Sequence, residues 1–126
     1  MTGITTTLGL KSSVELGMIL PHEHIFVDLR TWDIPGYAQA EVEEVIQLMA
    51  PEIRKAQEVG VTAIVECSTV GVGRRADIDR AVSEAANLPL VIPTGIYREP
   101  WVPDWAHAAS EAKLAEWMLS ELQGEI

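Results

Sequence analysis

The sequence predicts an α/β fold in which parallel strands alternate with helices. Three short apolar runs typical of strands start near residues 18, 61 and 90, and each is followed by a stretch whose apolar residues have helical spacing. Such alternation is typical of a parallel sheet with helical crossovers. Because 126 residues with 48% hydrophobic residues suffice for one core, we expect residues 1–126 to form a single domain.

A small β-ribbon is expected before the first main strand. Residues 4–8 are rich in threonine, and two glycines bracket a second segment, around residues 13–16, that we expect to be extended. The first main strand follows from Met18. Its regular pairing should weaken at Pro21, since proline has no N–H to donate to a neighbouring strand. Residues 28–40 are expected to form a loop.

The first long helix is expected between Glu41 and Val59. Its apolar residues recur at steps of three and four, as in an amphipathic helix: Val42, Val45, Ile46, Met49, Ile53, Ala56 and Val59. Pro51 should kink this helix or split it, because its ring removes a backbone hydrogen bond. Gly60 is expected to cap its end.

Two further strand and helix pairs are expected. The β-branched residues of 61–65 indicate a buried strand, and residues 90–92 a third strand. Asp77 is expected to cap the helix between them, which ends at Asn87, and Ser110 to cap the last helix. The predicted inner faces of these helices are Ile78, Ala81, Val82 and Ala85, and then Leu114, Trp117, Met118 and Leu122.

The charge and cysteine content argue against several function classes. With 19 acidic and 9 basic residues the formal net charge is −10, whereas nucleic acids and anionic membranes are bound through basic patches. A single cysteine, Cys67, excludes an internal disulfide. The N-terminal residues do not resemble a signal peptide, and no apolar run is long enough to span a bilayer. We therefore expect a cytoplasmic, soluble protein.

A pair of histidines at the end of the first strand is the strongest indication of chemistry. In a β-strand, His22 and His24 project to the same side, about 7 Å apart along the chain. Two imidazoles on one face can bind one zinc, manganese, cobalt or iron ion. Glu23 points the opposite way and is expected to support the site or the fold rather than bind the same ion. The alternative is that the histidines are ordinary polar residues at a strand end.

The other two strands also end in polar residues. In a parallel sheet the carboxyl ends of the strands meet at one rim, where α/β proteins place their sites. The second strand ends in Glu66-Cys67-Ser68-Thr69 and the third in Thr94-Gly95-Ile96-Tyr97-Arg98-Glu99. For these two ends, the ordinary tendency of strand ends to be solvated is an equally good explanation.

Several residues with chemical potential are interpreted as structural. Cys67 is expected to be a small buried residue rather than a nucleophile. Residues 71–74 resemble half of a phosphate-binding loop, and we favour a turn. His107 is expected at the surface, away from the rim. Trp101 and Trp105 either pack under their loop or line an apolar pocket, and packing is favoured.

Three motifs resemble those of one known family. Leu16-Gly17-Met18-Ile19-Leu20-Pro21-His22-Glu23-His24 resembles the opening signature of the phosphotriesterase-like family of the amidohydrolase superfamily. Glu66–Arg74 and Thr94–Pro100 resemble the second and third strands of that family with the loops that follow them. The resemblance extends over nearly the whole chain, in the order of the family.

This resemblance implies a (β/α)8 TIM barrel with a metal-dependent hydrolase site. Family members have two divalent metals, bridged by a hydroxide and a carboxylated lysine, and act on phosphotriesters, lactones and other esters. His22 and His24 would be metal ligands, with zinc expected and manganese, cobalt or iron as alternatives. Tyr97 would line the leaving-group side of the substrate pocket.

The chain departs from the family in length. The remaining ligands of the family, a lysine, two histidines and an aspartate on later strands, would lie beyond Ile126, and a complete barrel needs about 250 residues. We therefore expect a partial TIM barrel of three βα units, inactive without the C-terminal ligands. Such a chain would associate with itself or with a separate C-terminal half, or it is a truncated remnant or part of a longer product. The alternatives are a non-catalytic globular or interaction module, and a metal-free α/β protein whose histidines only pack.

Overall fold

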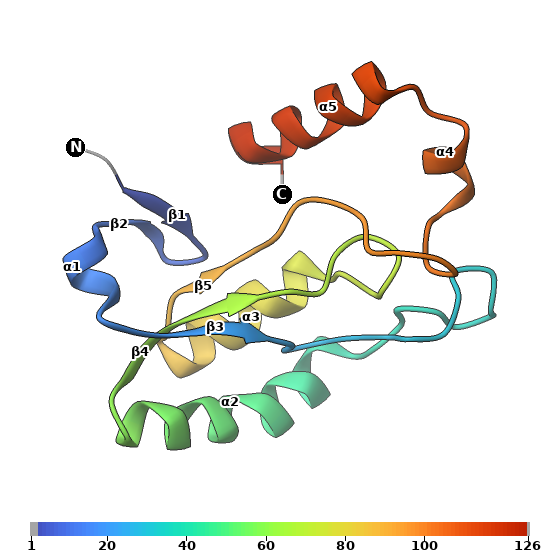
Figure 1. Ribbon diagram of the computed structural model, residues 1–126. Coiled ribbons are helices and arrows are strands. Elements are labelled where there is room, and N and C mark those ends of the chain that lie inside the picture. The colour runs from blue at the N-terminus through green and yellow to red at the C-terminus, as the bar shows by residue number, and fades with distance from the viewer. Residues whose placement is uncertain (1–2, 126) are drawn as a thin grey trace.

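A three-stranded parallel sheet forms the centre of the molecule. The computed structural model describes residues 3–125, and its central strands are β3 (Met18–Glu23), β4 (Val61–Glu66) and β5 (Leu90–Val91). Their order in the sheet is β3-β4-β5, and both pairs are parallel (Figure 1). The predicted alternation of parallel strands and helices is confirmed.

The expected β-ribbon precedes this sheet. Strands β1 (Ile4–Thr6) and β2 (Gly9–Lys11) pair in antiparallel fashion. Thr7, in the turn between them, donates its N–H to the carbonyl of Leu90, and its hydroxyl accepts the N–H of Leu90, both at 2.9 Å. The ribbon is therefore attached to the edge of β5 that faces away from β4.

The segment expected to be extended after the ribbon is instead a short helix, α1 (Ser13–Leu16). The Ser12 hydroxyl accepts the N–H of Glu15, and the Glu15 carboxylate accepts the N–H of Ser12 at 2.8 Å. This reciprocal capping box satisfies N–H groups that a helix start leaves unpaired, so local hydrogen bonding favours a helix over a strand. The short helix buries Leu16.

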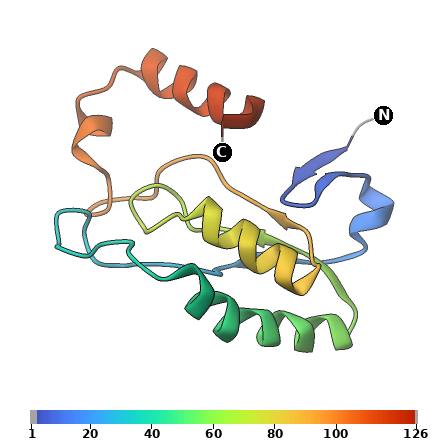
Figure 2. The same ribbon diagram turned by 180° about the vertical axis from the view of Figure 1, so that it is seen from behind.

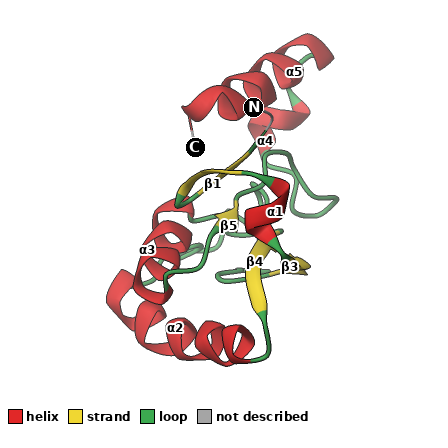
Figure 3. Ribbon diagram, turned by 90° about the vertical axis from the view of Figure 1, so that its left-hand side faces the viewer, coloured by secondary structure: helices red, strands yellow, loops and turns green. Residues whose placement is uncertain are grey.

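Helices α2 (Val42–Glu58) and α3 (Ala76–Ala86) lie side by side over one face of the sheet (Figures 2 and 3). The core lies between these helices and β4 and β5, and its buried residues are Ile25, Ala50, Ile53, Val61, Ile64, Ile78, Val82, Ala86, Leu88 and Leu90. Of the two expected effects of Pro51, a kink or a split, the split does not occur, because α2 continues through Pro51 as one element. Buried residues on either side of Pro51, Ala50 and Ile53, anchor both halves in the same core.

The start of α3 differs from the prediction, and its end agrees with it. The N-cap is Arg75, and Asp77 lies within the first turn, where its two carboxylate oxygens accept hydrogen bonds from the Arg75 guanidinium at 2.8 and 2.7 Å. Asp77 therefore lies inside the helix and pairs with the N-cap residue. Asn87 ends the helix in the left-handed conformation, as expected.

The inner face of α3 is more polar than predicted. Ile78 and Val82 are buried as expected, whereas Ala85 is exposed and Asp79 and Ser83 are buried in the helix. The Ser83 hydroxyl lies 2.5 Å from the hydroxyl of Thr7 and donates to the carbonyl of Leu88.

The C-terminal elements lie apart from α2 and α3, on the other side of the sheet (Figure 1). They are α4 (Asp104–His107), α5 (Glu111–Ser120) and a final helical turn, η1 (Glu121–Glu125). Ser110 caps α5 as predicted, by accepting the N–H of Lys113. No residue of α5 is buried against the part of the chain that the structure describes.

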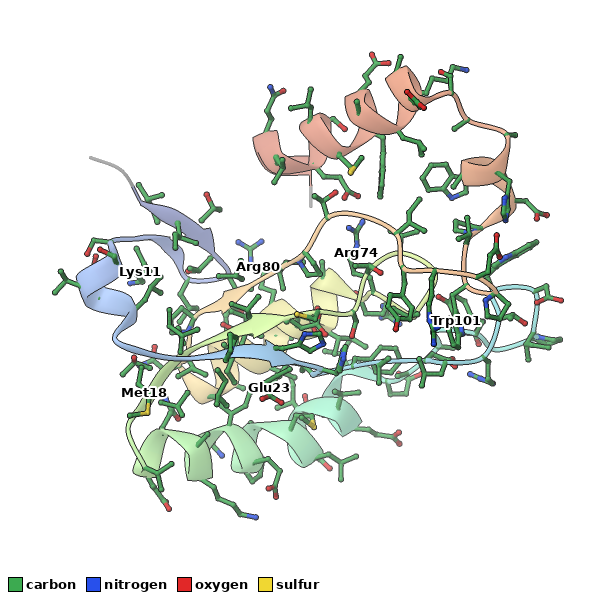
Figure 4. The ribbon with its side chains drawn as sticks, viewed as in Figure 1. Lys11, Met18, Glu23, Arg74, Arg80 and Trp101 are labelled. Atoms are coloured by element: carbon green, nitrogen blue, oxygen red, sulfur yellow. The ribbon has the colours of Figure 1, made fainter. Side chains whose placement is uncertain are left out.

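One ion pair connects this C-terminal segment to the sheet. Arg74, in the loop after β4, donates to the Glu121 carboxylate, with one contact of 2.8 Å, and to the carbonyl of Pro93 (Figure 4). Thr94 also donates to Glu121, at 2.6 Å. The end of α5 is thereby fixed over the carboxyl ends of β4 and β5.

The helices of residues 3–125 are too short or too polar to cross a lipid bilayer. This finding agrees with the sequence, in which no apolar run has the necessary length.

The loop after β4 is crossed closely by two other loops. A Cβ atom on Gly71 would lie 1.9 Å from the carbonyl oxygen of Trp101, and one on Gly73 would lie 2.6 Å from the backbone nitrogen of Asp28. The N–H of Gly73 donates to the hydroxyl of Tyr37 at 2.6 Å. Both glycines have positive φ angles, of 98° and 88°. The glycine pair therefore forms the expected turn and permits close backbone packing.

We predict that Gly71→Ala destabilises the protein by more than about 2 kcal/mol, because the added methyl meets backbone that cannot rotate away. Gly9→Ala is the matched control, since Gly9 has a φ of 88° and a Cβ added there would meet nothing within 4 Å. That variant should lose only about 1 kcal/mol of stability, which is the cost of holding a residue with a Cβ atom at a positive φ angle. Urea unfolding followed by circular dichroism measures both values, and equal losses would contradict the packing argument.

Candidate metal centre

The carboxyl ends of β3 and β4 are paired side by side. Glu23 lies opposite Glu66 in the parallel ladder, and the N–H of Cys67 donates to the carbonyl of Glu23 at 2.8 Å. The pairing is irregular between Leu20 and Glu23, so the predicted weakening at Pro21 is confirmed. This arrangement places the residues that follow the two strands next to one another.

The structure brings the two histidine rings together at this rim. The ring centroids of His22 and His24 are 5.4 Å apart, and the ring planes are inclined by 78°. Both side chains are exposed. Two neighbouring imidazoles that are accessible to solvent can bind the same ion.

Two buried residues at the end of β4 contact one of these rings. The Nδ1 atom of His24 lies 3.0 Å from the hydroxyl oxygen of Ser68 and 3.8 Å from Oε1 of Glu66. Ser68 and Glu66 have no exposed surface, whereas the His24 side chain is 39% exposed. The backbone N–H of Ser68 donates to Oε2 of Glu66 at 2.7 Å. His24 is therefore anchored on one edge and open to solvent on the rest of its ring.

Burial changes the protonation equilibrium of Glu66. Removal from water raises the pKa of its carboxyl group above the ordinary value, while hydrogen bonds from Ser68 and the nearby His24 act in the opposite direction. Oε1 of Glu66 has no hydrogen-bond partner among the described residues that meets ordinary geometric limits. A buried oxygen without a donor is costly, so a nearby donor is expected to turn toward it.

The donor chemistry of the histidine pair suits a divalent transition metal, since imidazole nitrogen binds zinc, manganese, cobalt and iron. The pair forms only part of a site. Within residues 3–125, no group of three or more histidine, cysteine, aspartate or glutamate residues is arranged to bind a metal ion. A catalytic zinc ion usually has three protein ligands, and two histidines alone are fewer than that number.

Glu23 lies on the side of the sheet that faces α2 (Figure 4). Glu23 is exposed and lines an open hollow of about 140 Å³ together with His24 and with Glu52 and Ile53 of that helix. Its expected role as a support of the site or the fold stays a prediction.

Tyr97 lies at the end of the third strand, in an aromatic cluster. Its side chain is 53% exposed, and its ring centroid lies 5.6 Å from that of Trp101. The Arg98 guanidinium lies 5.5 and 5.9 Å from the two ring centroids, and the Trp101 indole donates to the carbonyl of Leu29 at 2.8 Å. Trp101 thus packs between loops, and Tyr97 presents an aromatic surface at the rim.

The residues interpreted as structural agree with expectation only in part. Cys67 is half-buried rather than buried, and Trp105 lines an open apolar hollow as well as packing against another ring. Burial, with a smaller contribution from the charge of Glu66, raises the pKa of the Cys67 thiol, which opposes a role as nucleophile. His107 is exposed and pairs with Glu99 at 2.8 Å. Trp105 packs edge-on against Trp117, with ring centroids 5.1 Å apart.

A comparison with protein-family models decides the family. The model of the phosphotriesterase family matches residues 2–126. The chain belongs to the phosphotriesterase family. The chain is similar to the phosphotriesterase homology protein of Mycobacterium tuberculosis, with 31% identity over 110 residues. That match covers 85% of the chain and 33% of the relative.

Two solved structures match the chain and show which share of a longer protein it corresponds to. A double mutant of the organophosphorus hydrolase from Deinococcus radiodurans matches the whole chain with a TM-score of 0.83 and 25% identity. A resiniferatoxin-binding protein from Rhodobacter sphaeroides matches 94% of the chain with a TM-score of 0.80 and 25% identity. The present chain covers 40% of the first of these two proteins and 41% of the second. The predicted fold class, part of a TIM barrel with three βα units, is confirmed.

Sequence reasoning identifies the rim of this phosphotriesterase-family chain and misses the part played by Ser68 and Glu66. Both residues belong to the predicted polar end of a strand, and nothing in their spacing shows that Ser68 contacts a histidine 44 positions earlier. Parallel pairing of β3 and β4 produces that contact, so a prediction would need the exact register.

A second buried carboxyl group, that of Asp79, lies on α3. Asp79 is 1% exposed, and neither of its carboxylate oxygens has a hydrogen-bond partner among the described residues. Burial and then the negative charge of Glu66 raise the pKa of Asp79 to about 8. At neutral pH the folded protein therefore keeps Asp79 mostly protonated.

We predict that Asp79 makes stability depend on pH. The pKa of its carboxyl group is raised from 3.8 to about 8 on folding, so the folded state binds a proton that the unfolded state has lost, and stability falls as pH rises from about 4 to about 8. Asp79→Asn removes the ionisation. It should be more stable than the wild type by about 1 to 3 kcal/mol at pH 8, with a smaller difference at pH 4.

Thermal or urea unfolding across this pH range measures the difference. Asp77→Asn is the matched control on the same helix, because Asp77 is 59% exposed and its pairing with Arg75 lowers the pKa. This control should gain no stability at pH 8. An Asp79→Asn effect that is the same at every pH would show that burial of the charge is not the cause.

Proposed function

We propose that this chain is the N-terminal part of a divalent-metal-dependent hydrolase acting on phosphotriester, lactone or other ester bonds. The observation that carries the proposal is the convergence of His22 and His24 at the rim, in a chain of the phosphotriesterase family. The name of the Deinococcus radiodurans protein, an organophosphorus hydrolase, supports a phosphoester among the substrates. Zinc is the metal we favour, with manganese, cobalt or iron as alternatives.

In this proposal each rim residue has a distinct part. His22 and His24 bind the metal, which when bound lowers the pKa of a water molecule and polarises the oxygen of the ester. Ser68 and Glu66 anchor the His24 ring from the buried side. Tyr97, beside Trp101, provides an apolar wall for the leaving group.

We further propose that this site is completed by ligands outside residues 1–126. The matched relatives are about two and a half times as long, and two histidines are too few for a catalytic site. The missing ligands would come from a C-terminal half. Strand β3 has one sheet neighbour and α5 buries no residue within the described chain, so both surfaces suit association with a C-terminal half or with a second copy.

We predict weak, exchangeable binding of zinc or manganese by this chain alone. Isothermal titration calorimetry should show one weak site that disappears in the His22→Ala, His24→Ala double variant, because both proposed ligands are then removed. His107→Ala is the control, since His107 is exposed and pairs with Glu99. Tight binding that survives the double substitution would overturn the assignment of these ligands.

We also predict that esterase activity requires a C-terminal half. The chain alone should not hydrolyse an aryl phosphotriester or an aryl lactone at a rate above that of its His22→Ala, His24→Ala variant. Adding the C-terminal two thirds of the Mycobacterium tuberculosis relative with zinc should give activity that depends on both histidines. Hydrolysis by the chain alone, unaffected by the double substitution, would contradict the proposal.

The second candidate function is a non-catalytic binding module on the same scaffold. It is supported by the similarity to a protein named for binding resiniferatoxin, and by the two-histidine donor set. In this case zinc and the C-terminal half would give no hydrolysis, although the two parts would still associate. The reconstitution assay therefore separates the two candidates.

A further inference from the structure

We propose that Ser68, supported by Glu66, is a positioning residue that sets the tautomer of His24, with the proton on Nδ1 and the electron pair of Nε2 free. The inference rests on the proposed function only in assigning that electron pair to a metal. The tautomer itself is a property of the chain without metal and is tested separately.

The contacts of His24 fix which ring edge faces the protein. Nδ1 lies 3.0 Å from the hydroxyl oxygen of Ser68, which is fully buried, and 3.8 Å from Oε1 of Glu66. The side chain of His24 is nevertheless 39% exposed. Nδ1 therefore belongs to the buried edge, and Nε2 is the ring nitrogen left to bind a ligand.

The direction of the hydrogen bonds follows from the number of available protons. Oε2 of Glu66 already accepts the N–H of Ser68, at 2.7 Å, while Oε1 is buried and has no partner among the described residues. The Ser68 hydroxyl has one proton to donate. The backbone N–H of Ile25 lies near the carboxyl group but does not meet ordinary hydrogen-bond geometry. If the Ser68 proton went to Nδ1 of His24, the buried Oε1 would therefore have no well-aligned donor.

The opposite direction satisfies every group. When Nδ1–H of His24 donates to the Ser68 oxygen, the Ser68 hydroxyl is free to turn toward Oε1 of Glu66. Each buried oxygen then has a donor, which avoids the cost of an unpaired acceptor.

This tautomer is the one that prepares His24 for metal binding. A metal binds an imidazole nitrogen that has no proton, and a hydrogen bond at the other nitrogen fixes both the tautomer and the orientation of the ring. Without Ser68 the ring would exchange between tautomers and orientations. Ser68 thus acts through His24 and does not need to touch a substrate.

The Glu66→Gln variant is expected to reverse the tautomer of His24, not only to weaken its preference. The N–H of Ser68 requires an acceptor, so the amide oxygen of glutamine would occupy the place of Oε2, and the amide NH2 would occupy the place of Oε1. A donor would then face Ser68. The hydroxyl of Ser68 would donate to Nδ1, and the proton of His24 would move to Nε2.

The test is the tautomer of His24 in the metal-free chain, read from long-range 1H–15N NMR spectra at a pH at which imidazole is neutral. The three histidines are assigned by substituting each in turn. We expect Nδ1–H in the wild type, a mixture of tautomers in Ser68→Ala, Nε2–H in Glu66→Gln, and recovery of Nδ1–H in Ser68→Thr. Thr69→Val is the matched control, because the neighbouring hydroxyl of Thr69 has no hydrogen-bond partner among the described residues.

A wild-type His24 with its proton on Nε2, or a Ser68→Ala spectrum identical to the wild type, would overturn the proposal. Because Ser68 is fully buried, the wild-type spectrum decides the question even where a variant does not fold. A folded Glu66→Gln variant that keeps Nδ1–H would contradict the assigned direction of the hydrogen bonds.

A zinc titration of the same samples separates this inference from the proposed function. Ser68→Ala should weaken zinc binding about tenfold or more, while Thr69→Val should not change it. If the wild type has the expected tautomer and binds no zinc, the proposed function fails and the positioning role stands. If zinc binds through the histidine pair and His24 has Nε2–H without metal, the positioning role fails and the proposed function stands.

Discussion

The parallel pairing of β3 with β4 at their carboxyl ends determines the geometry of the rim. The backbone contact between Cys67 and Glu23 fixes the register there, and Ser68 then faces a histidine from the neighbouring strand. A shift of one residue in either strand would turn these side chains to the opposite face of the sheet. The candidate ligands, their anchor and the buried Glu66 are thus products of a single register.

Close packing of loops above the rim maintains that register. The turn at Gly71 and Gly73 permits the chains near Asp28 and Trp101 to lie directly against it. Arg74 then extends from the same loop to Glu121 and fixes the end of the last helix. The loop after β4 therefore connects the segments that follow all three central strands.

The sequence predicts the fold more completely than it predicts the site. The spacing of apolar residues predicts each central strand and each long helix, because the side chains that are buried on one face of an element recur at a fixed spacing in the sequence. The errors are local. The capping box of Ser12 and Glu15 turns an expected strand into a helix, and the N-cap of α3 lies two residues before the expected cap Asp77. The role of Ser68 is beyond prediction, since it depends on a contact between residues distant in sequence.

The attachment of the N-terminal ribbon to β5 has a consequence for how the sheet can grow. Leu90 uses both its N–H and its carbonyl group on Thr7, along the edge that faces away from β4. Backbone groups of alternate residues point to the same edge, so the next N–H and carbonyl on this side belong to Ile92. A strand added to this edge cannot pair with Leu90. The ribbon therefore restricts the register of any strand that extends the sheet toward a closed barrel.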